Sequence, residues 1–367
     1  MSAPRLEIDL DKIQHNARTL VERLALRGIS VTGVTKASLG SPEIACAMLR
    51  GGVKGLADSR IENIEAMRRA GVMASMALIR SPMLSQAERV VAHADVSFNT
   101  ELDVLGKLSS VAKEARKTHG VVLMVELGDL REGILPRDLE HAILGTLRLP
   151  NIVLMGIGTN LACRSGVVPS PENMGELSAL AESLEDRLGI EIPTVSGGNS
   201  ANLEWALGTT HVGRVNDLRL GEAILLGCEP LTRQPIEGLH TDAITLVAEV
   251  IEAKQKPTLP WGDIAQSAFG DSSRPKDQGR IRQTIFAVGR QDIDPEGLYL
   301  PEGTELLGAS SDHLVANLGT SHLPVGAEMT FQLNYSALLR AMTSSFVGKV
   351  VKTPRAGAPV VRPPLVG

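Results

Sequence analysis

The chain has 367 residues, with 37 Lys and Arg against 42 Asp and Glu and a formal net charge of −5. At roughly 150 residues per domain this length predicts two domains. The absence of an excess of positive charge argues against nucleic acid or an anionic membrane as the main partner. The sequence has no apolar run near the ~20 residues that a spanning helix needs. It also has no signal-peptide block, and its three cysteines are widely spaced, so we expect a reducing, cytoplasmic location.

Between residues 30 and 226, short apolar runs alternate with longer stretches at helical spacing, such as 101–117 and 171–188. Ser41 and Ser170, each followed by proline, are typical helix N-caps. Eight such units predict a (β/α)8 barrel, and an open doubly wound sheet is the alternative. The expected strands are Val31–Thr35, Gly55–Asp58, Met76–Ile79, Val96–Asn99, Val121–Leu127, Ile152–Asn160, Thr194–Ser196 and Asp217–Leu225.

After residue 230 the helical spacing disappears, and β-rich segments separated by Gly and Pro turns, one of them at Lys256-Pro257, predict a mostly-β domain over 231–352. Residues 1–230 would form the barrel, although the first strand could join the β domain. The proline-rich tail, 353–367, is expected to be disordered. The expected β segments are Ala243–Ile251, Ile281–Val288, Thr304–Leu307, Leu314–Leu318 and Met329–Leu333.

Three cationic residues stand where a barrel places its active site, at the carboxyl ends of the strands. Lys36 follows the first run, where partial desolvation suits a lysine to Schiff-base chemistry; a surface lysine is the alternative. Arg131, in the loop 129–133, could hold a carboxylate or a phenolate oxygen, or be exposed. Arg219 lies within the eighth run, where a buried arginine is costly unless it is paired or binds a ligand.

A loop suited to phosphate follows the seventh run. In Ser196-Gly197-Gly198-Asn199-Ser200-Ala201-Asn202 several backbone N–H groups converge near a helix N-terminus, although a capping turn without function is the alternative. The lysine of a nucleotide P-loop is absent. Asn160 ends the sixth run beside glycines that allow close approach of a ligand. Cys163, just beyond, is interpreted as a small buried thiol near the mouth of the barrel.

Metal and nucleophile patterns are weak. The eight histidines form no HxH or HExxH pattern, and Asp312-His313 with the distant His322 is not a ligand spacing. No Gly-x-Ser-x-Gly elbow is present. The sequence therefore predicts no metal site.

One lysine, a phosphate loop and arginines at separate strand ends together indicate pyridoxal phosphate (PLP). With these features the chain resembles the alanine racemase family of barrel-type PLP enzymes, and within it the branch that acts on ornithine, over nearly all of residues 4–350. The resemblance is carried by Ala57-Asp58-Ser59-Arg60, Leu127-Gly128-Asp129-Leu130-Arg131-Glu132-Gly133, Ser196-Gly197-Gly198-Asn199-Ser200, Leu307-Gly308-Ala309-Ser310-Ser311-Asp312-His313 and Tyr335-Ser336-Ala337-Leu338-Leu339.

The resemblance implies an amino-acid racemase that interconverts L- and D-ornithine by removing and returning the Cα proton of the substrate joined to PLP. Lys36 would form the Schiff base and act as one acid/base group. Arg219 matches the arginine at the pyridine nitrogen, which keeps its own proton and so favours racemisation over transamination. The other implied cofactor positions are Arg131 at the phenolic oxygen, Asn160 near the ring, Ser196, Gly198, Asn199, Ser200 and Gly221 around the phosphate, and Tyr335 near phosphate and substrate. The family forms head-to-tail homodimers in which the β domain closes the partner's barrel.

The chain departs from the family at the second acid/base group. Alanine racemases use a tyrosine in a Gly-Tyr-x-Asp context, where this chain reads Gly289-Arg290-Gln291-Asp292, and Tyr299 and Tyr335 are its only tyrosines. The segment Asp312-His313 is the favoured replacement, because histidine suits proton transfer near neutral pH. Asp292, or Lys36 acting on both faces, are alternatives, and Asp312 could instead contact the substrate while His313 only packs.

A substrate with a terminal ammonium needs a carboxylate opposite it, because an unpaired buried cation is expensive. Glu222 and Asp312 are the candidates, with Arg131 also near the substrate. If neither carboxylate faces the pocket, alanine, serine or a broad set of amino acids becomes the better substrate. Two further alternatives are a D-amino-acid aldolase, which usually wants a metal site, and a non-catalytic PLP carrier, which the large β domain disfavours.

Overall fold

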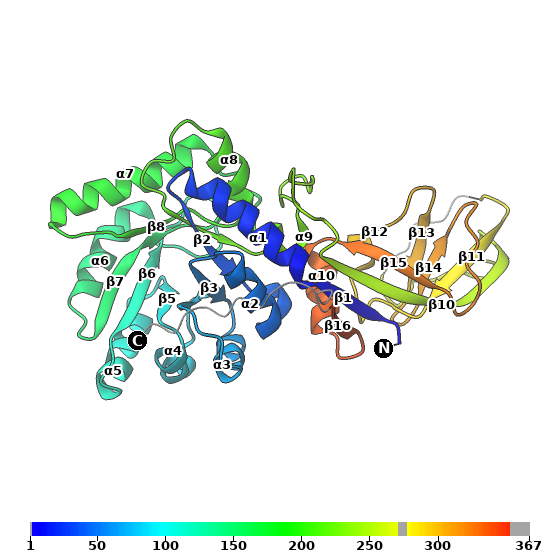
Figure 1. Ribbon diagram of the computed structural model, residues 1–367, viewed down its shortest axis with the longest axis horizontal. Helices are drawn as coiled ribbons and strands as arrows, with labels where there is room; N and C mark the ends of the chain where they lie inside the picture. Colours follow the sequence, from blue (N-terminus) through cyan, green and yellow to red (C-terminus); the bar gives the residue numbers. More distant parts are fainter. Residues whose placement is uncertain (1, 271–276, 353–367) are drawn as a thin grey trace. The chain divides into compact units, whose positions relative to one another are not determined.

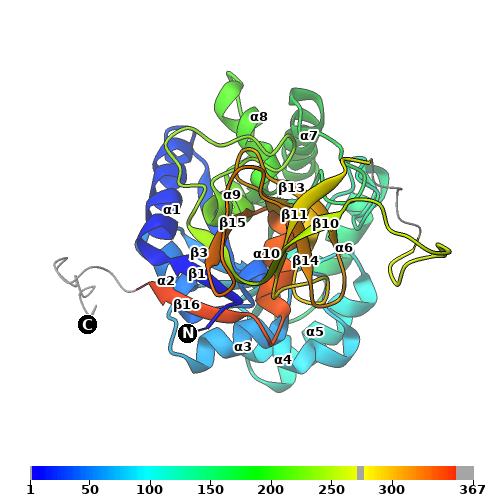
Figure 2. The ribbon, with the colours of Figure 1, turned by 90° about the vertical axis from the view of Figure 1, so that its right-hand side faces the viewer.

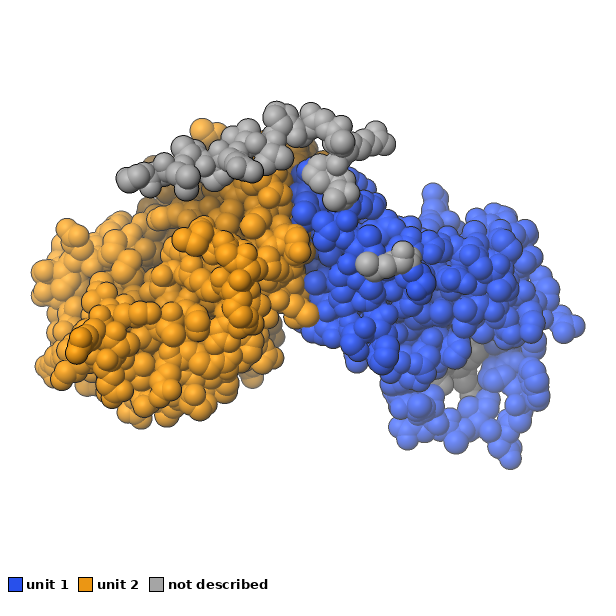
Figure 3. Space-filling view, turned by 60° about the horizontal axis from the view of Figure 1, so that its bottom comes forward, with its two compact units in different colours: residues 1–12, 242–367 blue, residues 13–241 orange. Residues whose placement is uncertain are grey.

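The computed structural model describes residues 2–270 and 277–352, and the chain divides into two compact units (Figure 3). The barrel unit comprises residues 13–241, and the β unit comprises residues 1–12 and 242–367. The change of unit therefore lies beyond residue 230, and the first strand is grouped with the β unit. The proline-rich tail, 353–367, lies outside the described residues.

The barrel unit contains a closed barrel of eight parallel strands, so the predicted (β/α)8 barrel is confirmed and the open sheet was the wrong alternative. Each strand pairs with the next, and the last returns to the first through the register Thr32↔Arg219. The strands are β2 Ser30–Val34, β3 Gly55–Asp58, β4 Met76–Leu78, β5 Val96–Asn99, β6 His119–Met124, β7 Ile152–Gly158, β8 Thr194–Ser196 and β9 Asp217–Leu220.

Helices α1 to α8 form a ring outside these strands (Figures 1 and 2). The predicted caps are confirmed, since Ser41 Oγ accepts a hydrogen bond from Ile44 N and Ser170 forms a reciprocal capping box with Asn173. No helix of the described residues is long and apolar enough to cross a membrane. The helices are α1 Leu10–Ala25, α2 Pro42–Arg50, α3 Ile61–Arg69, α4 Ala87–His93, α5 Leu102–Glu114, α6 Leu139–Leu147, α7 Pro171–Leu188, α8 Leu203–Gly208 and α9 Glu222–Leu226.

The eighth strand is shorter than its apolar run predicts. The expected strand 217–225 ends at Leu220, and the residues after Gly221 form helix α9 instead. Hydrogen bonds from Leu225 N to Gly221 O and from Gly227 N to Ala223 O define that helix. Gly227 ends it in the left-handed region, where a Cβ would lie 2.3 Å from His240 O. The apolar side chains are buried in either conformation, so hydrophobicity alone did not separate strand from helix.

The β unit is a mainly antiparallel sheet in the order β12-β15-β10-β11-β14-β13, with β1 paired to both β10 and β16. Phe286 and Phe331 pack edge to face in its core, with ring centroids 5.3 Å apart. The turn expected at Lys256-Pro257 is wrong, because β10 continues to Pro257 opposite Arg280. The strands are β1 Arg5–Asp9, β10 Ile244–Pro257, β11 Arg280–Phe286, β12 Leu298–Tyr299, β13 Glu305–Ala309, β14 Leu314–Asn317, β15 Glu328–Leu333 and β16 Gly348–Lys352.

The β unit also contains a helix that the sequence pattern did not predict, α10 Tyr335–Thr343. Asn334 caps it by accepting a hydrogen bond of 3.0 Å from Ala337 N. Its buried side chains recur at helical spacing at Ala337, Leu338, Ala341 and Met342. The expectation of no helix after residue 230 is therefore wrong for this segment.

A neutral histidine is buried against the outer side of the barrel wall. His119, at the start of β6, is 1% exposed, and its Nε2 lies 2.8 Å from Ser97 Oγ on β5. Asn99 Nδ2 donates to the Ser97 carbonyl at 2.8 Å and completes the cluster. Burial lowers the pKa of His119 to about 4, which Ala94 and Asp95 only partly oppose.

We predict that this histidine makes the protein acid-sensitive. Because its folded pKa lies below the ordinary 6.5, the unfolded chain takes up the proton first, and stability present above pH 6.5 is lost as the pH falls toward 4. Between about pH 7 and about pH 5 the loss should be about 2 kcal/mol. Urea unfolding measures the free energy of unfolding at each pH. His119→Gln should lose this part of its pH dependence, and His141→Gln, a change at an exposed histidine, should keep it. Equal pH dependence in the wild type and His119→Gln would contradict it.

Candidate functional site

A pocket of about 350 Å³ opens at the carboxyl ends of the barrel strands. Lys36, Arg131, Asn160 and Arg219, which the sequence singled out at separate strand ends, line it together. The sequence reasoning missed Arg80, Glu132, Ser59 and Ser81, which also line it. The pocket is strongly cationic, because Glu132 is the one acidic side chain beside a lysine and three arginines in its lining. Such a lining favours an anionic ligand.

Lys36 begins a short 3-10 turn, η1 Lys36–Ser38, directly after β2. Thr35 fixes this turn to the neighbouring strand: its N donates to Ala57 O at 2.9 Å and its Oγ1 donates to Asp58 Oδ2 at 2.7 Å. Asp58 is fully buried, and burial raises its pKa although four donors oppose the rise. The buried carboxyl group of Asp58 therefore fixes the backbone before Lys36, through its hydrogen bond with Thr35.

Arg219 is the most deeply buried cation of the pocket, at 4% exposed. Its Nη1 donates to Ser196 Oγ, and its Nη2 donates to Thr159 O at 2.7 Å and to Asn160 Oδ1 at 3.4 Å. The guanidinium carbon lies 5.0 Å from the centroid of the Phe98 ring. Burial lowers the pKa of Arg219, and the charge of Asp217 opposes that shift.

The Ser196 hydroxyl links Arg219 to the carboxylate of Asp217. Ser196 donates to Asp217 Oδ2, and Thr32 Oγ1 donates to Asp217 Oδ1 at 2.7 Å. Ser196 itself is fully buried, so it supports Arg219 rather than forming the surface of the phosphate loop. This chain of polar contacts joins β2, β8 and β9 beneath the pocket.

Arg131 is paired with its neighbour. Its Nε and Nη2 both donate to the carboxylate of Glu132. Burial lowers the pKa of Arg131, but Glu132 outweighs it and the net shift is upward. Asp129, in the same loop, accepts from the backbone of Arg164 and Ser165 at 2.9 and 3.0 Å. The loops after β6 and β7 are thus tied together.

The predicted phosphate loop forms the short 3-10 turn η4 Ser200–Asn202 after β8. Asn199 and Asn202 close it as a capping box. Gly198 has φ +141, and a Cβ there would lie 2.2 Å from Asn202 Oδ1. Ser200 Oγ accepts from Ala223 N at 3.2 Å, which brings the loop to the start of α9, where Gly221 is the N-cap. The loops after β8 and β9 therefore lie side by side.

Cys163 was wrongly interpreted as buried. Its thiol is exposed at the mouth, where the Asn160 and Asn199 side-chain amides donate to Sγ at 2.9 and 3.4 Å. Asn199 Nδ2 also donates to Asn160 Oδ1 at 3.2 Å. These contacts fix Asn160 between the phosphate loop and Arg219.

Glu222, the first residue of α9, is half-buried and is not in the pocket lining. Burial raises its pKa to about 7, and the charges of Arg233 and Lys36 oppose the rise. The carboxyl group of Glu222 therefore lies within electrostatic reach of Lys36. A neighbouring ammonium would favour its charged form.

The remaining predicted residues belong to the β unit. Asp312 and His313 are exposed in the turn between β13 and β14, where Gln291 donates to Asp312 and Ser310 Oγ lies 3.4 Å from His313 Nδ1. Tyr335 is half-buried at the start of α10.

Arg290, which stands where the resemblance leads us to expect a tyrosine, and the nearby Asp292 both have contacts of their own. Arg290 pairs with Glu296 at 2.6 Å, and its guanidinium carbon lies 5.4 Å from the ring centroid of Phe269. Asp292 is 5% exposed and accepts from Ser344 Oγ at 2.7 Å. These contacts make Asp292 a poor group for proton transfer with a ligand, since its carboxylate is enclosed and occupied.

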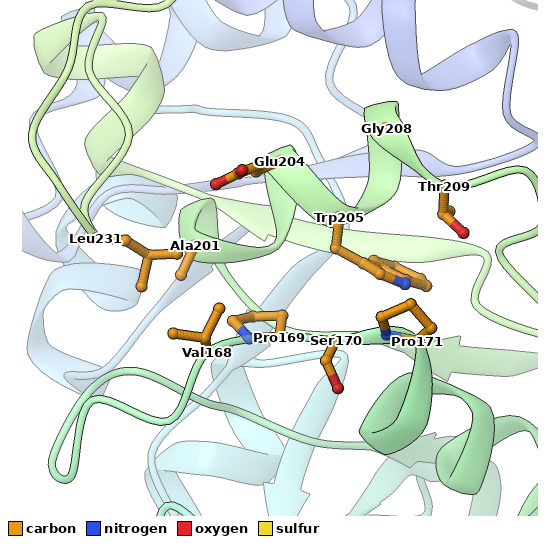
Figure 4. Close-up of a pocket in the computed structure, with 10 residues that line it drawn as sticks. All are labelled: Val168, Pro169, Ser170, Pro171, Ala201, Glu204, Trp205, Gly208, Thr209 and Leu231. Carbon is orange, nitrogen blue, oxygen red and sulfur yellow. The ribbon is translucent and has the colours of Figure 1, made fainter.

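A second hollow, of about 380 Å³, lies between α8 and the segment that leads into α7 (Figure 4). Trp205, Pro169 and Pro171 supply much of its wall, and Glu204 is the one ionisable residue in its lining. Without a cation, this hollow is unsuited to a phosphate or carboxylate. Of these two hollows, the pocket at the strand ends is the one whose lining suits an anion.

A closed barrel with a lysine, a buried arginine and a phosphate-type loop at its mouth has the architecture of a barrel enzyme. Residues 8–230 match the family model described as alanine racemase, N-terminal domain. The chain belongs to the alanine racemase family, and it is an amino-acid racemase.

Two relatives match nearly the whole chain. The ornithine racemase of Acetoanaerobium sticklandii is 37% identical over 351 residues, covering 94% of this chain and 99% of the relative. The lysine racemase of Thermotoga maritima is 38% identical over 353 residues, covering 95% and 99%. The alanine racemase from D-cycloserine-producing Streptomyces lavendulae shares the fold, with a TM-score of 0.74 at 19% identity over 97% of this chain and 99% of that one.

We predict that Thr35→Val destabilises the protein by about 1–3 kcal/mol, because the buried Asp58 carboxyl group loses a hydrogen-bond donor. Denaturant unfolding at neutral pH measures the loss. Thr118→Val makes the same chemical change at an exposed site and should cost little. Equal losses in the two variants would show that Asp58 does not depend on the Thr35 hydroxyl.

Proposed function

We propose that this racemase is PLP-dependent and interconverts L- and D-ornithine. The observation that carries the proposal is that Lys36 and Arg219 line one pocket, whose neighbouring strand ends supply two adjacent loops suited to phosphate. The relative named ornithine racemase supports the substrate. The relative named lysine racemase makes lysine, one methylene longer, the second candidate. Alanine, serine or a broad set of amino acids are further alternatives.

The residues of the pocket and of the two loops beside it suit the parts of PLP. Ser200 and the backbone beside Gly198 and Gly221 would hold the phosphate, because the first helical turns after both loops present N–H groups. A Cβ on Gly221 would lie 3.0 Å from Val34 O, so the chain there is packed closely. Arg219 would donate to the pyridine nitrogen and Arg131 to the phenolic oxygen. Asn160, fixed by Asn199, would lie beside the ring, and Tyr335 is assigned to the phosphate and substrate.

When bound and joined to the substrate, PLP withdraws electrons and acidifies the Cα proton. Lys36 would take this proton on one face of the substrate and return it. Arg219 keeps its own proton, since arginine is a very weak acid. It therefore limits electron withdrawal to what proton exchange at Cα requires, which favours racemisation over transamination.

The opposite face needs a second proton-transfer group. We assign it to Asp312 and His313, whose exposed turn suits transfer to a ligand outside the β unit. In a head-to-tail homodimer this turn would come from the partner subunit and close the mouth of the barrel. Lys36 acting on both faces is the alternative.

Glu222 is assigned to the terminal ammonium of the substrate. It does not line the pocket itself, but its carboxyl group interacts electrostatically with Lys36, which does. Glu132 lines the pocket but is already paired with Arg131. Glu222 interacts with Arg233 and Lys36 through charge but forms no ion pair among the described residues, so it is the better partner for an incoming cation.

We predict that Lys36→Ala abolishes both racemisation and exchange of the Cα proton, because the proton-transfer group is lost. Proton NMR in D2O, with PLP-loaded protein and single L-amino acids, measures the exchange. Lys54→Ala, at an exposed lysine before β3, should retain it.

Three results would separate the alternatives. Exchange of ornithine by Lys36→Ala would overturn the assignment of Lys36. If the wild type exchanges the Cα proton of alanine or serine alone, the substrate is a neutral amino acid instead of ornithine. A wild type that binds PLP and exchanges no amino acid would favour the PLP carrier.

We predict that Glu222→Gln raises the KM for ornithine at least tenfold and leaves the KM for alanine nearly unchanged. Because burial raises the pKa of Glu222 to about 7, kcat/KM for ornithine in the wild type should fall below that pH as the carboxylate takes up a proton. Glu222→Gln should lack this part of the profile. Glu132→Gln is the comparison, and a larger effect on ornithine there would transfer the role to Glu132.

A further inference from the structure

We propose that Arg80 is a specificity-determining residue that binds the α-carboxylate of the amino-acid substrate. This inference rests on the proposed function and adds the anion-recognition group of the same pocket. Arg80 follows β4, is half-buried and lines the pocket together with Lys36 and Arg219.

The three arginines of the pocket differ in how far their charges are already used. Arg219 is buried in contacts with Ser196 and Thr159, and Arg131 is paired with Glu132. Arg80 has no hydrogen bond or ion pair to any residue within 2–270 or 277–352. Its charge is therefore the one that a ligand carboxylate would neutralise without breaking an existing pair.

The strand order places Arg80 at the end of the pocket away from the phosphate loops. In the closed order β2-β3-β4-β5-β6-β7-β8-β9, β4 lies across the barrel from β8, which carries the loop with Ser200. Lys36 follows β2, two strands from β4. A phosphate held at Ser200 would therefore leave the side of the mouth between Lys36 and Arg80 for the substrate.

The neighbours of Arg80 also suit a carboxylate. Ser59, after β3, and Ser81, after β4, line the pocket beside it and carry hydroxyl donors without negative charge. Ser81 Oγ is buried and has no hydrogen-bond partner among the described residues. A buried hydroxyl without a hydrogen bond carries a free-energy penalty. A ligand carboxylate that accepts a hydrogen bond from Ser81 would remove this penalty and bind more tightly.

The test uses a ligand that has no stereocentre and so cannot be racemised. The compound 5-aminovalerate has the carboxylate and terminal ammonium of ornithine but no α-amino group, and 5-aminovaleramide replaces the carboxylate by a neutral amide. Calorimetry on the PLP-loaded wild type should give tighter binding of 5-aminovalerate. Arg80→Met should weaken that binding at least tenfold and leave the amide nearly unchanged, while Arg80→Lys should restore part of it.

Arg148→Met is the control, because Arg148 is exposed at the end of α6 and its loss changes the net charge equally. Unchanged binding of 5-aminovalerate in Arg80→Met would overturn the proposal. So would equal affinities of the wild type for acid and amide, including no measurable binding of either.

The same experiments distinguish a failure of the proposed function from a failure of the role given to Arg80. A carboxylate preference that depends on Arg80, in a protein that exchanges no Cα proton, would support carboxylate recognition while overturning the racemisation of ornithine. Exchange of ornithine with a KM that Arg80→Met does not change would uphold the proposed function and overturn the role of Arg80.

Discussion

The burial of one guanidinium constrains the whole mouth of the barrel. A charged side chain inside a protein must be paired and hydrogen-bonded to be tolerated. Arg219 meets this requirement with groups from four strand regions. It contacts the Ser196 hydroxyl at the end of β8, the Thr159 carbonyl after β7 and the Phe98 ring on β5. Through Ser196 it is also linked to the carboxylate of Asp217 on β9. A shift of any of these strands would leave the charge less well solvated, so the geometry of the pocket floor is fixed by electrostatics as well as by packing.

The pocket above this floor distributes its positive charge unevenly. Arg219 is hydrogen-bonded by the pocket floor, and Arg131 is paired with the adjacent Glu132. Arg80 is half-buried in the pocket wall. A site built in this way separates two tasks that both require cations. Permanently paired groups can orient a cofactor, while the group without a pair can respond to the substrate.

The sequence predicted the barrel well, because eight apolar runs followed by capped helices leave few other folds. It predicted α7 Pro171–Leu188 to the residue, since Ser170-Pro171 and Gly189 mark its ends. It failed where apolar residues are buried in either conformation, as in α9, and where a helix follows strands in a β-rich region, as in α10.

The site divides in the same way. Lys36 was recognised because it ends an expected barrel strand, and Arg219 because an arginine within a buried strand needs a partner or a ligand; the resemblance added their roles. Arg80 directly follows the expected strand Met76–Ile79, but it belongs to none of the stretches that carry the resemblance, so the sequence did not separate it from an ordinary surface arginine. Only the three-dimensional arrangement distinguishes it, through its place in the pocket lining and its lack of a partner in the described chain.

The pairing of β1 has a consequence for the order of folding during synthesis. Leu6 pairs with Leu246 on β10 and with Lys349 on β16, so both neighbours of the first strand are made more than 200 residues later. The ribosome releases all eight barrel strands in between. The barrel can therefore close while β1 still has two free edges, and a strand in that state is open to pairing with other chains until the last segment emerges.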